Sequence, residues 1–239
     1  MGEHILTINA GSSSLKFALF SDVALDCVAV GMIDGLGTNP HFVLKDGSGQ
    51  KIVSDPLEGE RAIDDHAGAM RLVLDTIAMH YPQAEIAAVG HRIVHGGMVH
   101  SAPVLVDEPI LSQLSELVPL APLHQPHNLS GIRAAQTAFP GVPQVACFDT
   151  AFHRAHPFVN DTFALPRSFY EEGVRRYGFH GLSYEYVTGK LAEIAPFHAK
   201  GRVIICHLGS GASMCAIRNG YSVASTMGFS ALDGLPMGT

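Results

Sequence analysis

Residues 4–20 read HILTINAGSSSLKFALF and predict a strand, a tight polar turn and a second strand. The first half is apolar and β-branched, and residues 15–19 alternate between apolar and other positions with the two-residue period of a strand. The turn at residues 11–14 offers backbone N–H groups and three hydroxyls as donors, and Lys16 adds a positive charge beside them. Such a turn suits a phosphate. The alternative is a surface hairpin whose serines only cap backbone groups, and this stretch leaves both interpretations open.

The composition predicts a substantial core and argues against a nucleic-acid partner. Of 239 residues, 47% are hydrophobic and 15% charged, and the formal net charge is −7. The chain shows no signal-peptide pattern and no run of about 18 apolar residues, so we expect a cytoplasmic protein without a membrane span. None of the four cysteines has CxxC spacing, which indicates reduced thiols: Cys27, Cys147, Cys206 and Cys215.

The first 150 residues predict an antiparallel meander followed by mixed helices and strands. A helix is expected from about Arg61 to His80, with Asp64 and Asp65 in its first turn. Its apolar stripe comprises Ile63, Ala67, Met70, Leu74 and Ile77. The other expected strands are 24–34, 41–45, 51–53, 85–90 and 142–148, and the other helices are 108–118 and 127–139.

From residue 150 the character of the sequence changes, which predicts a second domain. We expect helices at 167–173 and 182–194, and strands at 202–208, 214–218 and 221–225. Asn219-Gly220 is a hairpin signal between the last two strands.

Two strand ends carry candidate functional residues. The strand at 85–90 runs into Arg92 and paired glycines, a pattern typical of a ligand site, although Arg92 in a structural salt bridge is the alternative. Asp149 follows the strand at 142–148 and suits a metal-binding or base residue, or equally a helix cap. The spacings His124-x-x-His127 and His153-x-x-His156 lack the context of a zinc site. His124, near a helix start, is better suited to donate to an anion or a carbonyl.

The opening stretch has an echo later in the chain. A shift of 198 positions places residues 5–8 on 203–206 and Gly11-Ser12 on Gly209-Ser210. Chance similarity of two hairpins is the alternative. If the echo is real, two related domains each begin with a phosphate-binding hairpin, and two such tips facing each other would clamp the phosphates of a nucleotide. Lys16 in the first copy is Met214 in the second.

Six motifs in this order together resemble acetate kinase: INAGSSSLK at 8–16, HRIVHGG at 91–97, PLHQPHN at 122–128, FDTAFH at 148–153, RYGFHG at 176–181 and HLGSGAS at 207–213. The resemblance spans essentially the whole chain. It implies an α/β fold with duplicated sugar-kinase/actin-like (ribonuclease H-like) domains, whose mixed sheets are flanked by helices. The first domain would be residues 1–150 and the second, incomplete, residues 151–239.

The resemblance implies phosphoryl transfer between ATP and acetate, giving ADP and acetyl phosphate, with Mg²⁺ or Mn²⁺ as cofactor. The implied catalytic residues are Arg92, Asp149 and His180. The implied substrate-binding residues are Arg92, Val94, Leu123, His124 and Phe179. The implied phosphate- and nucleotide-binding residues are Ser12, Ser14, Lys16, His207, Leu208, Gly209, Ser210 and Gly211, and Asn9 would hold the metal. Because acetate is already ionised at pH 7, we expect Asp149 to position the metal rather than act as an essential base.

The chain departs from the family pattern at several positions. It has Ser210 where the family usually has Asn, Tyr184 where a second His is common, and Ala231 where a Pro is usual. The change at Ala231 leaves the choice between acetate and propionate open. Family members also run much further, so we expect a truncated form with negligible kinase activity and exposed apolar surface where helices are missing.

Three alternative functions remain. One is a propionate or butyrate kinase, another is a non-catalytic actin-like nucleotide-binding module, and the third is a non-catalytic partner protein. The resemblance further implies a homodimer in the full-length form, with small-molecule substrates and with neither nucleic acid nor membrane as a partner.

Overall fold

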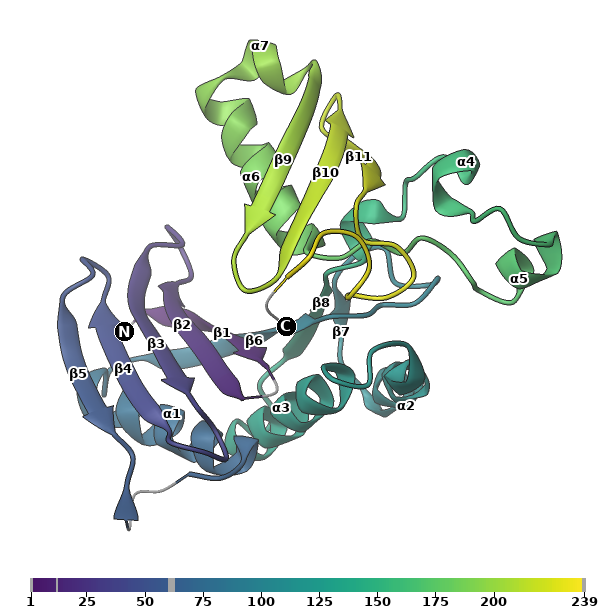
Figure 1. Cartoon of the computed structure of the whole chain (residues 1–239). Coiled ribbons are helices and arrows are strands. Elements are labelled where there is room, and N and C mark those ends of the chain that lie inside the picture. Colours follow the sequence, from purple (N-terminus) through teal and green to yellow (C-terminus); the bar gives the residue numbers. More distant parts are fainter. Residues whose placement is uncertain (1, 12, 60–62, 238–239) are drawn as a thin grey trace. The chain divides into compact units, whose positions relative to one another are not determined.

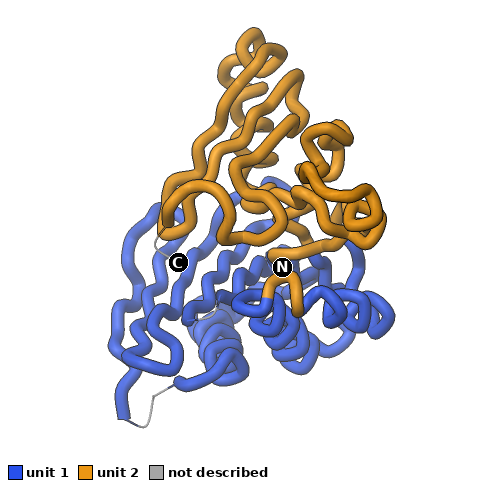
Figure 2. The backbone as a smooth tube through the Cα atoms, turned by 45° about the vertical axis from the view of Figure 1, so that its right-hand side comes forward, with its two compact units in different colours: residues 1–93, 104–118, 122–146 blue, residues 94–103, 119–121, 147–239 orange. Residues whose placement is uncertain are grey.

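The computed structural model describes residues 2–11, 13–59 and 63–237. The chain divides into two compact units (Figure 2). Unit 1 comprises residues 1–93, 104–118 and 122–146, and unit 2 comprises residues 94–103, 119–121 and 147–239. The division into domains at residue 150 stays a prediction.

Unit 1 is built on a mixed sheet with the order β5-β4-β3-β2-β1-β6-β8-β7 (Figure 1). The predicted antiparallel meander is confirmed, because β1 to β5 pair in chain order. These strands are β1 (Glu3–Ala10), β2 (Ser14–Ser21), β3 (Cys27–Asp34), β4 (His41–Asp46) and β5 (Lys51–Pro56). The sheet continues through β6 (Glu85–Ile93), which is parallel to β1, and through β8 (Gln144–Phe148) and β7 (Val104–Leu105). The sheet is therefore mixed, as predicted, and with the helices described next it confirms the predicted α/β class.

Helices cover one face of this sheet. They are α1 (His66–His80), α2 (Glu108–Glu116) and α3 (Gln125–Ala138), and a short 3-10 turn, η2 (Val118–Leu120), follows α2 (Figure 1). The predicted alternation in β2 is confirmed, because Leu15, Phe17 and Leu19 are buried and Lys16 is exposed. These side chains join Leu6 and Ile8 of β1 in the main core of the unit. Burying one such side chain contributes about 1.5–3 kcal/mol, so this face holds the unit together.

Two expectations for α1 are wrong in detail. The helix begins at His66, and Asp65 is its N-cap, whose carboxylate accepts from Gly68 N at 2.7 Å. Asp64 and Asp65 therefore precede the first turn, and Arg61 lies outside the described residues. The buried face of the helix is His66, Ala69, Met70, Val73, Thr76 and Ile77, so the predicted stripe is displaced by part of a turn.

Unit 2 holds a three-stranded antiparallel sheet with the order β11-β10-β9. Its strands are β9 (Arg202–Leu208), β10 (Ala212–Arg218) and β11 (Tyr221–Ser225). The predicted turn between the last two is confirmed, because Asn219 and Gly220 both have positive φ, at 52° and 83°. The helical segments are η3 (Ala151–His153), α4 (Phe158–Asp161), α5 (Arg167–Glu171), α6 (Gly181–Ile194) and α7 (Pro196–Ala199).

The helix α6 packs on this sheet through a small core of its own. Tyr184 from the helix meets Ile205, Cys215 and Ile217 from the strands. Pro196 follows the C-cap residue of α6, Ala195, and lies in the first turn of α7.

Across the described part of the chain, no helix is long and apolar enough to cross a membrane.

Candidate functional site

The tip of the first hairpin is a closed turn in unit 1. Ala10 pairs with Leu15 across the strands, and Gly11 N donates to Ser14 O at 2.8 Å. Ser13 O accepts from Leu36 N at 2.8 Å, which ties the turn to the loop after β3. Ser14 is half-buried at the start of β2, and Ser12 lies outside the described residues. Backbone hydrogen bonds therefore close the tip and join it to the loop after β3.

Two side chains, each in the first turn of a helix, brace the tip by contacting its backbone carbonyl groups. Asn128 Nδ2 donates to Ala10 O at 2.7 Å, and Asn128 is buried in α3. His66 Nε2, at the start of α1, lies 2.7 Å from Gly11 O. Because a carbonyl oxygen only accepts, His66 must carry a proton on Nε2. The consecutive carbonyl groups of Ala10 and Gly11 are therefore each held by a side chain.

The predicted residues Asn9 and Arg92 lie together on neighbouring strands. β1 and β6 run parallel, with Ile8 opposite His91, so both strands end at the same edge of the sheet. Arg92 Nη1 donates to Asn9 Oδ1 at 3.1 Å. The guanidinium is half-buried beside the end of β1, which suits recognition of a carboxylate or a phosphate.

The described residues do not form a preorganised metal-binding site. Asn9 Oδ1, the oxygen that would ligate an ion, accepts from a guanidinium, and a second cation beside it is electrostatically unfavourable. No group of three or more His, Cys, Asp or Glu that could hold a metal occurs among the described residues. The Asn9 side chain, engaged by the Arg92 guanidinium, does not fit a Mg²⁺ ligand.

The remaining predicted residues of unit 1 lie at the start of α3. His124 is the N-cap residue of that helix, and its side chain makes no capping hydrogen bond there. The adjacent Leu123 has 59% of its surface exposed. Val94 and Phe179, predicted to form one apolar wall with Leu123, belong to unit 2 and share a buried cluster with Ala121, Tyr177 and Met227.

Asp149 follows β8 in unit 2, and its side chain is buried. Its backbone oxygen accepts from Gly181 N at 2.8 Å. A Cβ at Gly181 would lie 2.2 Å from that oxygen, so only glycine permits this approach. Asp149 is thereby joined to the first residue of α6, directly after His180.

His180 and His207 are stacked, with ring centroids 4.0 Å apart. His180 has φ 58° at the N-cap of α6, a left-handed conformation that is uncommon outside glycine. His180 Nδ1 lies 2.8 Å from Ser213 Oγ, and His207 Nδ1 lies 3.0 Å from Ser183 Oγ. Each imidazole is therefore oriented by a serine.

The glycine turn after β9 lies beside His180. Gly209 N donates to Gly211 O at 3.0 Å, which closes the turn that includes Ser210. A Cβ at Gly211 would lie 3.0 Å from His180 Nε2. Leu208 is 75% exposed at the end of the strand. The structure thus brings the predicted residues His207 to Gly211 together with His180.

The pair His153 and His156 has a structural explanation. His153 Nδ1 and His156 Nε2 each lie 2.8 Å from Ser222 Oγ, and His153 Nε2 lies 2.9 Å from Phe179 O. Burial lowers the pKa of both imidazoles to about 4, so both are neutral at pH 7. They connect β11 to the segment carrying Phe179.

The sequence comparison identifies one family. The model of the Acetokinase family matches residues 4–239. The chain belongs to this family. The acetate kinase of Methylocella silvestris is 56% identical over 247 residues, which cover 100% of this chain and 61% of that protein. The acetate kinase of Nitrobacter hamburgensis is 50% identical over 240 residues, which cover 99% and 59%. The chain spans about three-fifths of the length of these curated relatives.

Solved structures of the acetokinase family share the fold. A propionate kinase from Francisella tularensis matches with a TM-score of 0.89 at 37% identity, covering 99% of this chain and 60% of that one. The acetate kinase of Porphyromonas gingivalis matches with a TM-score of 0.84, with the same identity and coverage. The predicted sugar-kinase/actin-like fold class and the family resemblance are confirmed.

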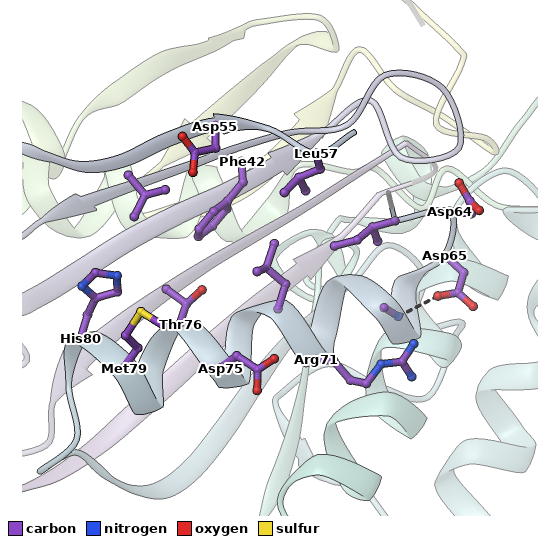
Figure 3. Close-up of a pocket in the computed structure, with 14 residues that line it drawn as sticks. Phe42, Asp55, Leu57, Asp64, Asp65, Arg71, Asp75, Thr76, Met79 and His80 are labelled. Carbon is purple, nitrogen blue, oxygen red and sulfur yellow. Dashed lines mark hydrogen bonds between the residues drawn. The ribbon is translucent and has the colours of Figure 1, made fainter. Parts of the chain in front are cut away.

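A cavity of about 650 Å³ in unit 1 is lined by none of the predicted site residues that the structure describes (Figure 3). Phe42, Leu57 and Asp55 line it from the β4–β5 region, and Arg71 and Asp75 line it from α1. It is therefore not the cavity in which the predicted residues would act.

The sequence left four contacting residues without a role. Asn128 and Ser213 end two of the six motifs, and this position was a signal that could have marked them. Tyr184 stood out only as a departure from the family pattern. His66 gave no signal, because its partner Gly11 lies 55 positions away.

Proposed function

We propose that the whole protein catalyses phosphoryl transfer between ATP and acetate, giving ADP and acetyl phosphate. The observation that carries this proposal is the arrangement in unit 1, where the Arg92 guanidinium bonds Asn9 beside the braced hairpin tip. The family supports the proposal, because relatives at 50% identity and above are acetate kinases. The proposal concerns the whole protein, since the chain spans about three-fifths of these relatives.

The chemistry places few demands on a base. A carboxylic acid with a pKa near 4 is ionised at pH 7, so the acetate oxygen is already a nucleophile. That oxygen attacks the γ-phosphorus in line, the bond to the bridging oxygen of ADP breaks, and ADP leaves with the electron pair. Catalysis then requires alignment of the reactants and neutralisation of charge on the phosphoryl oxygens.

The residues of each unit suit one part of this work. In unit 1, Arg92 would bind the carboxylate or the transferring phosphoryl group, and Ser12, Ser14 and Lys16 would surround the phosphates. His124 would donate to the anion, with Leu123 beside it. Unit 1 thereby supplies the positive charge.

In unit 2, His180 would stabilise the transition state, and residues 207–211 would hold the nucleotide phosphates through backbone N–H groups. Val94 and Phe179 would face the methyl group of the substrate. Asp149 would act as a positioning residue and not as the base that takes a proton. Mg²⁺ belongs to this proposal only as the ion that accompanies the nucleotide phosphates.

A hydroxamate assay tests the proposal. The whole protein, incubated with ATP, acetate and hydroxylamine, should form acetyl hydroxamate, and replacing Arg92 with alanine should abolish it. Absence of product from the whole protein would overturn the proposal. The 239-residue chain assayed alone tests the prediction of negligible activity, and the predicted homodimer is tested by the mass of the whole protein in solution.

A propionate kinase is the second candidate, favoured by the similarity to the Francisella tularensis protein and by Ala231 at a usual proline position. One methylene is worth only about 1–3 kcal/mol of discrimination. The ratio of kcat/KM for acetate and propionate decides between the two, and a ratio above one for propionate would favour this candidate.

A further inference from the structure

Tyr184 is a buried tyrosine whose hydroxyl lies inside unit 2. The side chain is 0% exposed on α6, and its Oη contacts Ser213 Oγ of β10. Ser213 is also 0% exposed, and its Oγ lies 2.8 Å from His180 Nδ1. A buried hydroxyl requires a partner, and these contacts form a continuous chain from Tyr184 through Ser213 to His180.

The available acceptors determine which hydroxyl donates to which neighbour along this series of hydrogen bonds. Tyr184 Oη has a single proton, and Ser213 Oγ is the acceptor that lies against it. Burial raises the pKa of Tyr184 to about 12, so the phenol stays protonated and remains a donor at neutral pH. Ser213 also has one proton, and the contacts of its Oγ among the described residues are Tyr184 Oη and His180 Nδ1. With Tyr184 donating to that oxygen, the serine proton is directed to His180 Nδ1.

We infer that Tyr184 and Ser213 are positioning residues that hold the neutral imidazole of His180 as the Nε2–H tautomer. An Nδ1 that accepts from Ser213 is unprotonated, so the proton of the neutral ring lies on Nε2. The catalytic use of this tautomer rests on the role proposed above for His180.

The backbone and the ring stack fix the direction of that donor. His180 is held at φ 58° at the start of α6, and its ring lies on that of His207. Nε2 faces the glycine turn, because a Cβ at Gly211 would lie 3.0 Å from it. A phosphoryl oxygen only accepts hydrogen bonds, so the Nε2–H form attracts it and the opposite tautomer presents a lone pair that repels it.

Long-range ¹H–¹⁵N spectra of the histidine rings in the 239-residue chain test the tautomer directly. We expect the wild type to show the Nε2–H pattern for His180. Ser213→Ala should convert it to a mixture of tautomers, and Ser213→Thr, which retains the hydroxyl, should restore it. Tyr184→Phe should have a smaller effect, because Ser213 keeps its own proton. Tyr186→Phe is the matched control, since Tyr186 lies on the same helix and is 67% exposed.

The outcomes separate this inference from the proposed function. An Nδ1–H pattern in the wild type, or an unchanged pattern in Ser213→Ala, would overturn the inference. In the whole protein, Ser213→Ala should lower kcat about tenfold or more with little change in KM, and Ser213→Thr should recover it. An unchanged kcat would also overturn the inference. If the tautomer is as expected but the whole protein forms no acetyl phosphate, the proposed function fails while the hydrogen-bond chain stands.

Discussion

The two hairpins β1–β2 and β9–β10 share a topology but differ in what surrounds their tips. In each, a third strand pairs with the second, giving the orders β3-β2-β1 and β11-β10-β9. The first tip is braced from below by Asn128 and His66, which bind its carbonyl groups. The second tip lies beside the stacked imidazoles of His180 and His207. A repeated scaffold therefore carries two different sets of polar groups.

The two units also differ in how much titratable imidazole they bury. Burial lowers the pKa of His95, His153 and His156 in unit 2 to about 4. In unit 1 burial lowers the pKa of His91 and His127 less far. This difference predicts that acid acts on the two units unequally.

Acidification should have the largest effect of all the changes considered. Between about pH 6.5 and pH 4 the unfolded state binds protons at these histidines while the folded state does not, so stability falls as pH falls. Each of these three histidines contributes at most about 1.4 kcal/mol per pH unit, so unit 2 should lose several kcal/mol. Amide spectra recorded across this range should lose the signals of unit 2 before those of unit 1. His156→Gln should weaken the pH dependence, and simultaneous loss of both units would contradict the prediction.

Exchanging the residues that differ between the hairpins tests the division of chemistry. Lys16→Met gives the first hairpin the residue of the second and removes the charge proposed to meet the phosphoryl group. We expect the kinase activity of the whole protein to fall about 10²–10³-fold. Met214→Lys is the control, because Met214 has no proposed role, and it should change activity by less than about threefold. Equal losses in both variants would show that the hairpins do not differ in this way.

Gly181→Ala tests the packing beside the second hairpin. The new Cβ would lie 2.2 Å from Asp149 O, so the helix start and the segment after β8 must separate. Overpacking of this kind costs about 3 kcal/mol, measured as a lower urea midpoint. Gly189→Ala on the same helix has nothing within 4 Å and should stabilise by about 1 kcal/mol. A Gly181→Ala protein as stable as the wild type would show that the close approach is not required.

The sequence predicts these hairpins well and their surroundings poorly. Alternation in β2 and the Asn219-Gly220 turn are local signals, because period and positive φ act within a few residues. β7 has two residues and so no period to detect. The bond from Asn128 to Ala10 joins positions 118 apart, and no spacing in the chain encodes it. The predicted site residues could be named because the sequence resembles a family. The contacts of Asn128 and His66 with the hairpin tip could be found only in the folded structure.

Asn128→Leu should remove one of the two side-chain hydrogen bonds to the first hairpin tip while keeping the number and branching of the side-chain heavy atoms. The Ala10 carbonyl then loses a buried donor, which costs about 1–3 kcal/mol. The urea midpoint of unit 1 should fall accordingly, and the amide signals of residues 11–16 should shift. Ser130→Ala, at an exposed position of the same helix, should stay within about 0.5 kcal/mol of the wild type. If the two variants are equally stable, the hydrogen bond from Asn128 does not stabilise the tip.

His66→Phe should have the smallest effect on stability. It tests the contact between His66 and Gly11 O, and the pKa of the neighbouring His127 gives a second measurement. The phenyl ring can retain the ring contact with His127, whose centroid lies 5.0 Å from that of His66, but it cannot donate to Gly11 O. The loss should be about 1 kcal/mol. The pKa of His127 is lowered first by burial and second by the charge of His66, so removing that imidazole should raise it part of the way towards 6.5. NMR titration of His127 measures this change. His66→Gln retains a donor near Gly11 O, so it should recover the stability while the pKa of His127 still rises. A variant that loses stability without moving this pKa would show that the two rings do not interact, and that the brace acts only through the hydrogen bond.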